Sequence, residues 1–389
     1  MCLMKKWQKI LIEIIAVVIF ILVALKLVQL WTGVNPLDNI THQKDALENI
    51  NEVAAALTLE MEEWKDGTVV LFIEDIPESE LLNINYIMSN LNGSVDSFQL
   101  HPKLFGIRRV DFQIVRSDNS YVYDAYMNGT PIPEDRVEAQ KLYKVVKQII
   151  EIEIGDQHLT EYQRELVLHD YLVEHCTYSY GKADDDNEFR AYGALVEGQA
   201  VCNGYAEAMA LLLSCAGVEN QYVVGTAKSG SRAAVTDNGD GTVTPNQEKK
   251  ENHAWNLVKL NGTWYHLDAT WDDPVGEKDV LSHAYFNMSD ELMERDHTWN
   301  HDKYESCPDM SWNYFVRSKK YFQDSYSLDA AVTQMVTAHP YGTLEFAYSQ
   351  FEITNTTLQG LSTVPGLSSV YYSTVGSFAF SVITLYINQ

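Results

Sequence analysis

Cys202 is the residue in this sequence whose neighbours are best suited to support chemistry. It stands in GQAVCNGYAEAMALLLSCAG, residues 198–217, where small residues lead into an apolar helical pattern. At the N-terminus of such a helix a thiolate gains stabilisation from the helix dipole and from unpaired backbone amides. Most free cysteines are instead small buried hydrophobic residues. The stretch by itself therefore leaves two interpretations open, a nucleophile and a core cysteine.

A predicted β-hairpin brings a histidine close to an aspartate. Its sequence is NHAWNLVKLNGTWYHLDATWDDP, residues 252–274, in which Asn261-Gly262 separates two strand-like runs. Asn-Gly is the strongest short signal for a two-residue hairpin turn. Pairing the strands symmetrically about this turn makes His253 and Asp268 diagonal neighbours on one face, roughly 7–8 Å apart at Cα. That separation lets the carboxylate hold the imidazole, provided that no one-residue bulge breaks the register.

Cys202, His253 and Asp268 together have the chemistry of a nucleophilic triad. The carboxylate orients the imidazole, the imidazolium stabilises the thiolate, and the Cys202 amide can donate to an oxyanion. Gly198 and Gly204 are expected to leave room for a substrate backbone beside the sulfur. Sequence spacing alone still favours the alternative that these are three unrelated core residues.

The order of these motifs resembles that of the transglutaminase-like (transglutaminase/protease) superfamily, and most closely its bacterial membrane-anchored members. The resemblance is specific over about residues 156–322, and it extends more loosely to HPKLFGIRRVDF in the N-terminal part. The stretches that carry it are, in order, GQAVCNGYAEAMALLLSCAG, NHAWNLV, WYHLDATWDDP, HAYFNMSDELMERDHTW and NYFVRSKKYF.

The resemblance implies a papain-like α+β fold, in which the cysteine helix packs on an antiparallel sheet that carries the histidine and the aspartate. It further implies that Cys202 is the nucleophile, His253 the general base and Asp268 the orienting carboxylate. Because all three residue types are present, nothing in the motifs marks an inactive copy.

Three further residues are candidates for support of the site. Gln199, three residues before the cysteine, could donate a hydrogen bond to the oxyanion, and Tyr192 is a similar candidate. Trp255 is expected to line the cleft, although core packing would explain it equally well.

The remaining cysteines and histidines are not expected to form a metal site. His297, His301 and Cys307 lack an evident fourth ligand, and their spacing fits no closed zinc site. Cys176 and Cys215 are most simply core residues. We therefore expect no metal and no cofactor.

The composition describes a folded, strongly acidic protein. Of its 389 residues, 46% are hydrophobic, and the formal net charge is −26. Nucleic-acid binding requires clustered Lys and Arg, so this charge argues against a nucleic-acid partner and disfavours adhesion to anionic lipid surfaces. The expected partners are a protein or peptide substrate, for which the cell envelope is one source, and the membrane that holds the N-terminal helix.

The N-terminal apolar run predicts a membrane anchor. ILIEIIAVVIFILVALKLVQLW, residues 10–31, is about the length that spans a bilayer. Lys5, Lys6 and Lys9 precede it, so the positive-inside rule predicts a cytoplasmic N-terminus and an extracytoplasmic remainder. A cleaved signal peptide is the alternative, but no small-x-small cleavage site follows the run, which favours a retained anchor.

The sequence is predicted to divide into four segments. Residues 1–34 form the cytoplasmic stub and the anchor, 35–155 an α+β companion domain, 156–322 the transglutaminase-like core, and 323–389 an extension without an assigned role. Periodicity and turn signals predict helices over 41–64, 78–91 and 131–152, a strand over 67–75, a hairpin formed by RRVDFQIVR and YVYDAYMNG, a helix opened by Thr160, a strand over 221–228, a loop or weak hairpin over 229–252, and a small sheet near 368–389.

The sequence thus predicts a membrane-anchored cysteine acyl-transfer enzyme that acts outside the cytoplasm. Cys202 would attack an amide carbonyl, from a peptide bond or a glutamine side chain, and form a thioester. Water would complete hydrolysis and a lysine amine would complete cross-linking, and hydrolysis is somewhat favoured. The alternative from another class is a non-catalytic binding or scaffolding module at the cell surface, built on the same fold.

Overall fold

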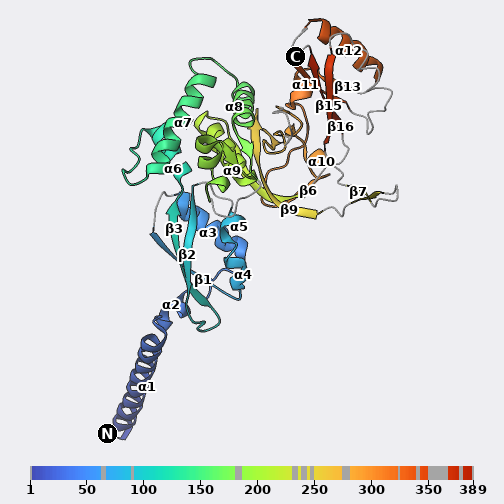
Figure 1. Cartoon of the computed structure of the whole chain (residues 1–389). Coiled ribbons are helices and arrows are strands. Elements are labelled where there is room, and N and C mark those ends of the chain that lie inside the picture. Colours follow the sequence, from blue (N-terminus) through green and yellow to red (C-terminus); the bar gives the residue numbers. More distant parts are fainter. Residues whose placement is uncertain are drawn as a thin grey trace. The chain divides into compact units, whose positions relative to one another are not determined.

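The computed structural model describes most of the chain, in two compact units (Figure 1). The units are Met1–Ser120 and Tyr121–Gln389. The described residues are 2–62, 67–88, 92–179, 186–229, 235–237, 243–245, 249–273, 281–322, 325–338, 342–348, 367–375 and 380–387.

The first unit begins with the apolar segment that the sequence predicts to be an anchor. Helix α1 spans Cys2–Thr32, and a short helix, α2, follows over Pro36–Thr41. Within α1, Glu13–Thr32 has a mean hydropathy of 2.7, so its length and composition suffice to cross a membrane. A signal sequence would meet the same criterion.

The rest of the first unit is a three-stranded antiparallel sheet with short helices. The sheet order is β1-β3-β2, and its core contains Leu57, Ile73 and Phe112. The elements are α3 (Ile50–Glu62), β1 (Gly67–Ile73), α4 (Glu78–Leu81), α5 (Ile84–Met88), β2 (Gly93–Leu100) and β3 (Arg108–Arg116). The predicted strand at 67–75 is therefore confirmed.

The two helices predicted in this unit are shorter than expected. The helix predicted over 41–64 begins only at Ile50, because the backbone at Leu47 is extended and hydrogen-bonds to Phe72 and Glu74 beside β1. The helix predicted over 78–91 is two helices, α4 and α5, with Asn83 between them donating to the Ser79 carbonyl. Residues 63–66 and 89–91 of these predictions lie outside the described part of the chain.

The predicted hairpin of RRVDFQIVR and YVYDAYMNG is wrong. The first run is β3, but the second belongs to helix α6, Asp118–Asn128. Ser117 accepts a hydrogen bond from the Ser120 amide, as a helix N-cap does. Val122 and Ala125 are buried, and their spacing of three residues is helical rather than alternating. The tyrosines of the run alternate with other residues as in a strand, but the Ser117 cap favours the helix.

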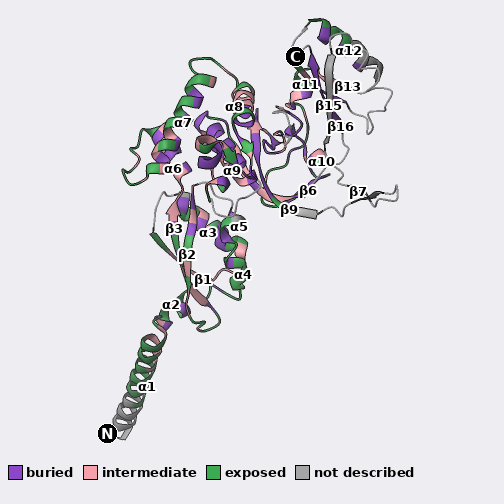
Figure 2. Ribbon diagram, in the orientation of Figure 1, coloured by how far each residue is buried: buried purple, intermediate pink, exposed green. Residues whose placement is uncertain are grey.

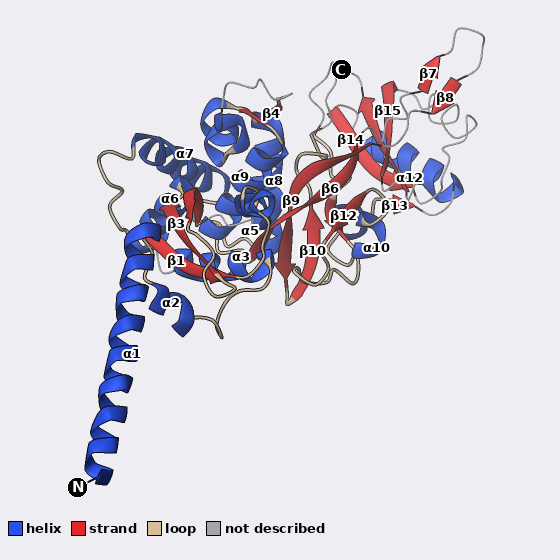
Figure 3. Cartoon of the chain, turned by 90° about the horizontal axis from the view of Figure 1, so that it is seen from below, coloured by secondary structure: helices blue, strands red, loops and turns tan. Residues whose placement is uncertain are grey.

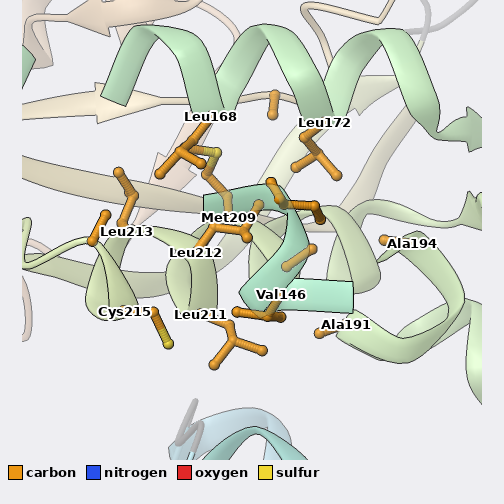
Figure 4. Packing of buried hydrophobic residues seen from close by; sticks show 14 of the residues in the cluster. Val146, Leu168, Leu172, Ala191, Ala194, Met209, Leu211, Leu212, Leu213 and Cys215 are labelled. Carbon is orange, nitrogen blue, oxygen red and sulfur yellow. The ribbon is translucent and has the colours of Figure 1, made fainter. Parts of the chain in front are cut away.

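Four helices build the core of the second unit (Figure 4). They are α6, α7 (Val137–Glu153), α8 (Glu161–His175) and α9 (Cys202–Cys215). Val146 from α7, Leu168 and Leu172 from α8, and Met209 and Leu212 from α9 belong to one buried cluster. Because α6 and α7 share this cluster, the compact units divide after Ser120, whereas the sequence suggested a boundary after residue 155.

Helix α8 begins where the sequence predicts it. The Thr160 hydroxyl accepts from the Gln163 amide, and the Gln163 side chain accepts from the Thr160 amide, which completes a capping box. Helix α9 is buried along most of its length (Figure 2) and carries alanine and leucine on several faces. An all-round apolar helix is typical of a core position.

A five-stranded antiparallel sheet lies against α9 (Figure 3). Its order is β11-β10-β9-β6-β12. The turn residues Asn261 and Gly262 have φ of 49° and 85°, the left-handed pair of a type I′ turn. The strands then pair symmetrically about the turn, as predicted, with His266 opposite Leu257. The strands are β6 (Asn220–Ser229), β9 (Lys249–Leu260), β10 (Thr263–Leu267), β11 (Phe286–Met288) and β12 (His297–Trp299).

The C-terminal part forms a second sheet with the order β13-β14-β16-β15. The small sheet predicted near 368–389 is therefore present, although 376–379 and 388–389 lie outside the described residues. Its elements are β13 (Tyr321–Phe322), α12 (Ser325–Ala338), β14 (Gly342–Tyr348), β15 (Leu367–Val375) and β16 (Phe380–Ile387).

Short elements complete the second unit. In the segment predicted as a loop or weak hairpin, two three-residue strands pair antiparallel. The fold is mixed α+β, with a cysteine helix on an antiparallel sheet. The short elements are β4 (Thr177–Tyr178), η1 (Asp186–Phe189), η2 (Gly193–Glu197), β5 (Gln199–Ala200), β7 (Val235–Asp237), β8 (Val243–Pro245), α10 (Asp290–Met293) and α11 (Tyr314–Arg317).

Candidate active site

Cys202 is the first residue of α9, where the helix leaves backbone amides without intrahelical acceptors. The preceding N-cap residue is Val201, with extended backbone angles. Because valine has no polar side-chain atom, it cannot satisfy the amides of the first turn as serine or aspartate would. The Cys202 sulfur therefore lies at the positive end of the helix dipole, beside these amides. The residue as a whole is 7% exposed.

His253 lies on β9, and its two ring nitrogens have different partners. Nε2 is 2.7 Å from Asp268 Oδ2, and the Cys202 sulfur lies near enough to the ring to raise the pKa of His253. The thiol itself lies 3.6 Å from Asn203 Oδ1. Because Nε2 is engaged by the carboxylate, Nδ1 is the nitrogen left for the sulfur. The rings of Trp255 and Trp271 lie beside the imidazole, with centroid distances of 5.9 and 5.7 Å. The imidazole is thus held by the carboxylate at Nε2 and by neighbouring aromatic rings.

Asp268 lies directly after β10 and is fully buried, with every lone-pair direction of its carboxylate occupied. Oδ2 accepts from His253 and, at 3.1 Å, from His297 Nε2. Oδ1 accepts from the backbone amides of Thr270 and Trp271, at 3.1 and 3.2 Å. A carboxylate that accepts several hydrogen bonds is held in its charged form.

The electrostatics of the site favour an imidazolium–thiolate pair. Burial raises the pKa of the Cys202 thiol, but the hydrogen bond and charge of His253 lower it by more, so the net pKa lies below the usual value. Burial lowers the pKa of His253, but the charge and hydrogen bond of Asp268 raise it by more, to about 10. Burial raises the pKa of Asp268, whereas the charge and hydrogen bonds of His253 and His297 bring it below its usual range.

The structure thus brings the three predicted residues together, with His253 hydrogen-bonded to Asp268 and close to Cys202. The sulfur, the imidazole and the carboxylate come from the start of α9, from β9 and from the end of β10. A thiol with a lowered pKa forms its thiolate more readily, a thiolate can attack a carbonyl carbon, and an adjacent imidazolium can protonate a leaving amine. The free amides of the first turn of α9 can stabilise an oxyanion.

His297 is a second histidine that hydrogen-bonds to the Asp268 carboxylate. The sequence does not predict this position for it. Its Nδ1 is 2.7 Å from Asp296 Oδ1, and Asp296 Oδ2 accepts from the Tyr285 hydroxyl at 2.7 Å. His297 reaches Asp268 because β12 pairs with β6. The sequence gives only a weak indication of this role for His297. The indication is the adjacent Asp-His pair in RDHTW, in which the aspartate can fix the orientation of the ring.

Trp255 supports the histidine by packing, as the sequence suggests. Its indole N–H donates to His266 Nδ1 at 3.0 Å, and His266 Nε2 lies 2.8 Å from Asp290 Oδ1. Because Nδ1 accepts a hydrogen bond from the indole N–H, His266 is the neutral Nε2–H tautomer, and burial lowers its pKa. The Trp255 N–H is therefore engaged away from the sulfur.

The other two support candidates lie in different surroundings. The Tyr192 side chain belongs to the core cluster of the second unit, and its hydroxyl accepts from Lys141 Nζ at 3.4 Å. Gln199 is exposed on β5, three residues before the cysteine. Of the three candidates, Trp255 is the one whose ring contacts that of His253, at 5.9 Å.

The two glycines near the cysteine serve the packing of the chain itself. A Cβ at Gly204 would lie 2.7 Å from both the Ala200 Cβ and the Glu188 carbonyl oxygen. Gly198 has a left-handed φ of 71° and ends the π-helical turn η2. The expectation that these glycines leave space for a substrate is therefore corrected, because chain atoms occupy the space beside Gly204.

The three residues considered as zinc ligands have separate partners. His297 belongs to the Asp268 chain, His301 lies 3.5 Å from the exposed Glu294, and the Cys307 amide donates to Asp290. Among the described residues, three groups have ligand atoms within 4.8 Å of one another: His253, Asp268 and His297; His169, Asp170 and His283; and His266, Asp290 and Cys307.

The family comparison covers the segment that contains all three residues of the chain described above. Residues 150–269 match the family model described as the Transglutaminase-like superfamily core. These residues are therefore similar to a transglutaminase-like domain. Cys202, His253 and Asp268 all fall inside the matched range, and the family favours a cysteine enzyme that acts on amides.

Solved structures are similar to the transglutaminase-like domain at low sequence identity. One is the crystal structure of a TGase, with 13% identity and a TM-score of 0.27, covering 54% of this chain and 52% of that one. A putative cysteine protease from Cytophaga hutchinsonii has 16% identity and a TM-score of 0.24, with coverage of 46% and 65%. The periplasmic domain of TgpA from Pseudomonas aeruginosa has 15% identity and a TM-score of 0.23, with coverage of 46% and 65%. The chain thus spans less than two thirds of these structures, and no curated protein matches it.

Proposed function

We propose that this protein is a membrane-anchored cysteine acyl-transfer enzyme that acts outside the cytoplasm on an amide bond. The amide belongs to a peptide bond or to a glutamine side chain. Cys202 is the nucleophile, His253 the acid and base, and Asp268 the residue that orients the imidazole. The observation that carries the proposal is the hydrogen bond between His253 and the buried Asp268 beside Cys202, whose thiol pKa lies below its usual value.

The reaction follows from the charges of these groups. The Cys202 thiolate attacks the amide carbonyl carbon, and the oxygen takes the charge beside the first-turn amides of α9. The carbon–nitrogen bond breaks as the His253 Nδ1 proton passes to the leaving amine, which leaves a thioester on the sulfur. Water then attacks the thioester and gives a proton back to Nδ1. The carbon–sulfur bond breaks, and the acid product and the thiolate–imidazolium pair result.

Water is the acceptor that we favour, with hydrolysis as the outcome. A lysine amine would give cross-linking by the same steps, but it requires a second site that binds and deprotonates the amine. Hydrolysis requires only the imidazole that the first half of the reaction leaves neutral.

The location rests on the N-terminal segment. Glu13–Thr32 is apolar enough to cross a membrane, and Lys5, Lys6 and Lys9 precede it. These lysines favour a cytoplasmic N-terminus by the positive-inside rule. The domain that carries Cys202 then lies on the outer side.

A binding module on the same fold is the second candidate, and the burial of the sulfur favours it. Cys202 is 7% exposed, so a substrate carbonyl needs some opening of the surface to reach the thiolate. In this alternative the three side chains form a polar core network, and the domain holds a partner without chemistry.

Trapping of the acyl intermediate tests the proposal. The full chain, purified in detergent, is mixed with a denatured protein that is rich in glutamine and lysine, quenched in acid and analysed by mass spectrometry. We expect an acyl adduct on Cys202 that hydroxylamine releases. The adduct should persist in Cys215→Ala and disappear in Cys202→Ala. A folded protein that forms no adduct on Cys202, or one that keeps the adduct in Cys202→Ala, would exclude this mechanism.

A further inference from the structure

A second cluster of histidines and carboxylates lies in the same unit as the candidate active site. His169 and Asp170 are neighbours on α8, and His283 lies in the segment before β11. His169 Nδ1 and His283 Nε2 are each 3.0 Å from one oxygen, Asp170 Oδ1. These three atoms come from side chains whose donor types suit a transition metal, and they lie within 4.8 Å of one another.

The outer nitrogen of each histidine is held by a second carboxylate. His169 Nε2 is 3.1 Å from Asp272 Oδ2, and His283 Nδ1 is 2.7 Å from Glu345 Oε2. Asp272 Oδ1 in turn accepts from the Tyr285 amide at 2.7 Å. Histidines that bind metals usually donate their other ring N–H to a carboxylate in this way, which fixes the ring and makes it a better ligand.

The second carboxylates and the rings are fixed before any ligand binds. Glu345 Oε1 accepts from the Ser282 hydroxyl and the His283 amide, at 3.1 and 3.0 Å. The His283 ring stacks on Tyr314 with a centroid distance of 3.7 Å and an interplanar angle of 8°. The His169 ring meets the edge of Phe286 at 5.0 Å. Metal sites need this kind of preorganised support.

We propose that His169 Nδ1, His283 Nε2 and Asp170 Oδ1 bind a divalent transition-metal ion of the zinc class. Imidazole nitrogens favour such ions over magnesium or calcium, which prefer oxygen ligands. The histidine side chains are 0% and 6% exposed, whereas the Asp170 side chain is 31% exposed. The ion therefore enters from the Asp170 side, where solvent completes its coordination.

Metal binding here stabilises the loop that carries Asp268. Asp272, the outer partner of His169, donates its backbone amide to the Asp268 carbonyl at 3.1 Å. Glu345, the outer partner of His283, lies on β14 of the C-terminal sheet. An ion that fixes both histidines thus connects α8, the Asp268 loop and the C-terminal sheet, independently of any acyl-transfer activity.

Metal titration of the full chain in detergent tests the proposal. The protein is stripped with chelator and dialysed against Zn²⁺, and bound metal is counted by mass spectrometry, with thermal unfolding as a second readout. We expect about one equivalent of Zn²⁺ and a higher unfolding temperature with metal. Asp170→Asn should lower the Zn²⁺ affinity at least roughly tenfold, and Glu345→Gln by roughly 10- to 100-fold.

Control variants separate this site from the other two groups. Because His253, Asp268 and His297 also lie close together, the titration is repeated in His253→Ala, which should keep the equivalent of Zn²⁺. X-ray absorption of zinc-loaded His253→Ala should show two imidazole ligands and no sulfur ligand. In this measurement His169, Asp170 and His283 all keep their native side chains. Loss of the metal in His253→Ala, a sulfur ligand from the Cys307 group, or unchanged affinity in Asp170→Asn would overturn the proposal.

Discussion

The two ends of α9 carry one cysteine each, and the pKa values of the two thiols are shifted in opposite directions although both residues are buried. Cys202 is 7% exposed and Cys215 is 5% exposed. Burial raises the pKa of Cys215 to about 12. At Cys202 burial acts in the same direction, but the hydrogen bond and charge of His253 outweigh it and lower the pKa. The difference shows that a charged partner, rather than the degree of burial, decides whether a thiol of this protein is reactive.

The surroundings of the two ends explain the difference. The first turn of α9 faces β9, which presents His253, and it offers amides without acceptors. The last turn lies in the leucine-rich cluster of the second unit, to which Cys215 belongs (Figure 4). Cys176 in the same cluster behaves like Cys215, since burial raises its pKa to about 12. We call the Cys202 end of the helix the reactive end, after the role proposed for its thiol, and the Cys215 end the packing end.

Removing each sulfur in turn should give the largest contrast. Cys202→Ala should reduce amide cleavage at least roughly a thousandfold, because no other group replaces the nucleophile. Cys215→Ala should leave the rate within about a factor of two, and its effect should fall on stability instead. Cleavage of a fluorescent denatured protein measures the rates. Similar losses in the two variants would contradict the assignment of a reactive end.

Removing the imidazole should make the two ends alike. In His253→Ala, Cys202 keeps its burial but loses the charge that lowers its pKa, so its alkylation rate at about pH 6 should fall roughly 10- to 100-fold. Iodoacetamide labelling followed by peptide mass spectrometry measures the rate at each cysteine. Cys215 labelling is the internal control and should not change. A Cys202 rate that stays at the wild-type level would show that the helix end alone activates the sulfur.

A substitution that displaces Trp255, which packs beside His253, should change the reactivity of Cys202. A Cβ at Gly225 would lie 2.2 Å from the Thr298 carbonyl oxygen and 2.7 Å from the Trp255 ring. Gly225→Ala should therefore cost about 1–3 kcal/mol in the free energy of unfolding, as overpacking does. It should also slow Cys202 alkylation without changing Cys215.

The neighbouring Thr226→Ala is the matched control for this change. It removes only the hydroxyl contact with Thr298 on the same strand pair, and it should cost about 1 kcal/mol or less. Chemical unfolding measures both variants. Equal costs for the two substitutions would mean that the close approach at Gly225 is not needed.

The pH dependence of the free energy of unfolding should also reveal the charge of His253 at the reactive end. His253 has a raised pKa of about 10 in the folded protein, against about 6.5 in the unfolded chain. A group whose pKa is raised by folding contributes its full stabilisation to the folded protein at pH values below its pKa in the unfolded chain. That stabilisation is lost as the pH rises to its pKa in the folded protein. Unfolding free energy should therefore fall between about pH 7 and 10, by at most about 1.4 kcal/mol per pH unit.

A Cys202→Ala background keeps the thiol from titrating in this experiment, and Asp268 still raises the pKa of His253. Cys202→Ala/His253→Gln is the control, and its stability should fall less steeply over the same range. Parallel curves for the two proteins would show that His253 is not charged in the fold.

The sequence predicts the reactive end better than its surroundings, for physical reasons. Asn261-Gly262 specifies the turn type, and the turn specifies the register that brings His253 to Asp268, so the information is local. His297 reaches Asp268 only through the pairing of β12 with β6, which no short-range signal sets. The cluster at His169 likewise joins residues more than a hundred positions apart.

Local sequence patterns also give a wrong prediction where a helix N-cap precedes residues that alternate as in a strand. Tyr121, Tyr123 and the residues that follow alternate as in a strand, yet Ser117 caps the helix α6. The family resemblance supplies the roles of the three site residues, which spacing alone does not. The divide between the compact units after Ser120 depends on packing of α6 and α7, which becomes visible only in three dimensions.

The most direct test is the titration of the two thiols by their own ultraviolet absorbance, because a thiolate absorbs and no reagent has to reach the buried sulfur. The absorbance of the wild-type protein minus that of Cys202→Ala gives the Cys202 thiolate, and the difference from Cys215→Ala gives the other. We expect the Cys202 thiolate to appear below the usual cysteine pKa of about 8.5, and the Cys215 signal to be absent until strongly alkaline pH. A Cys202 thiolate that appears only above about pH 8.5 would contradict the imidazolium–thiolate pair, and with it the proposed enzyme.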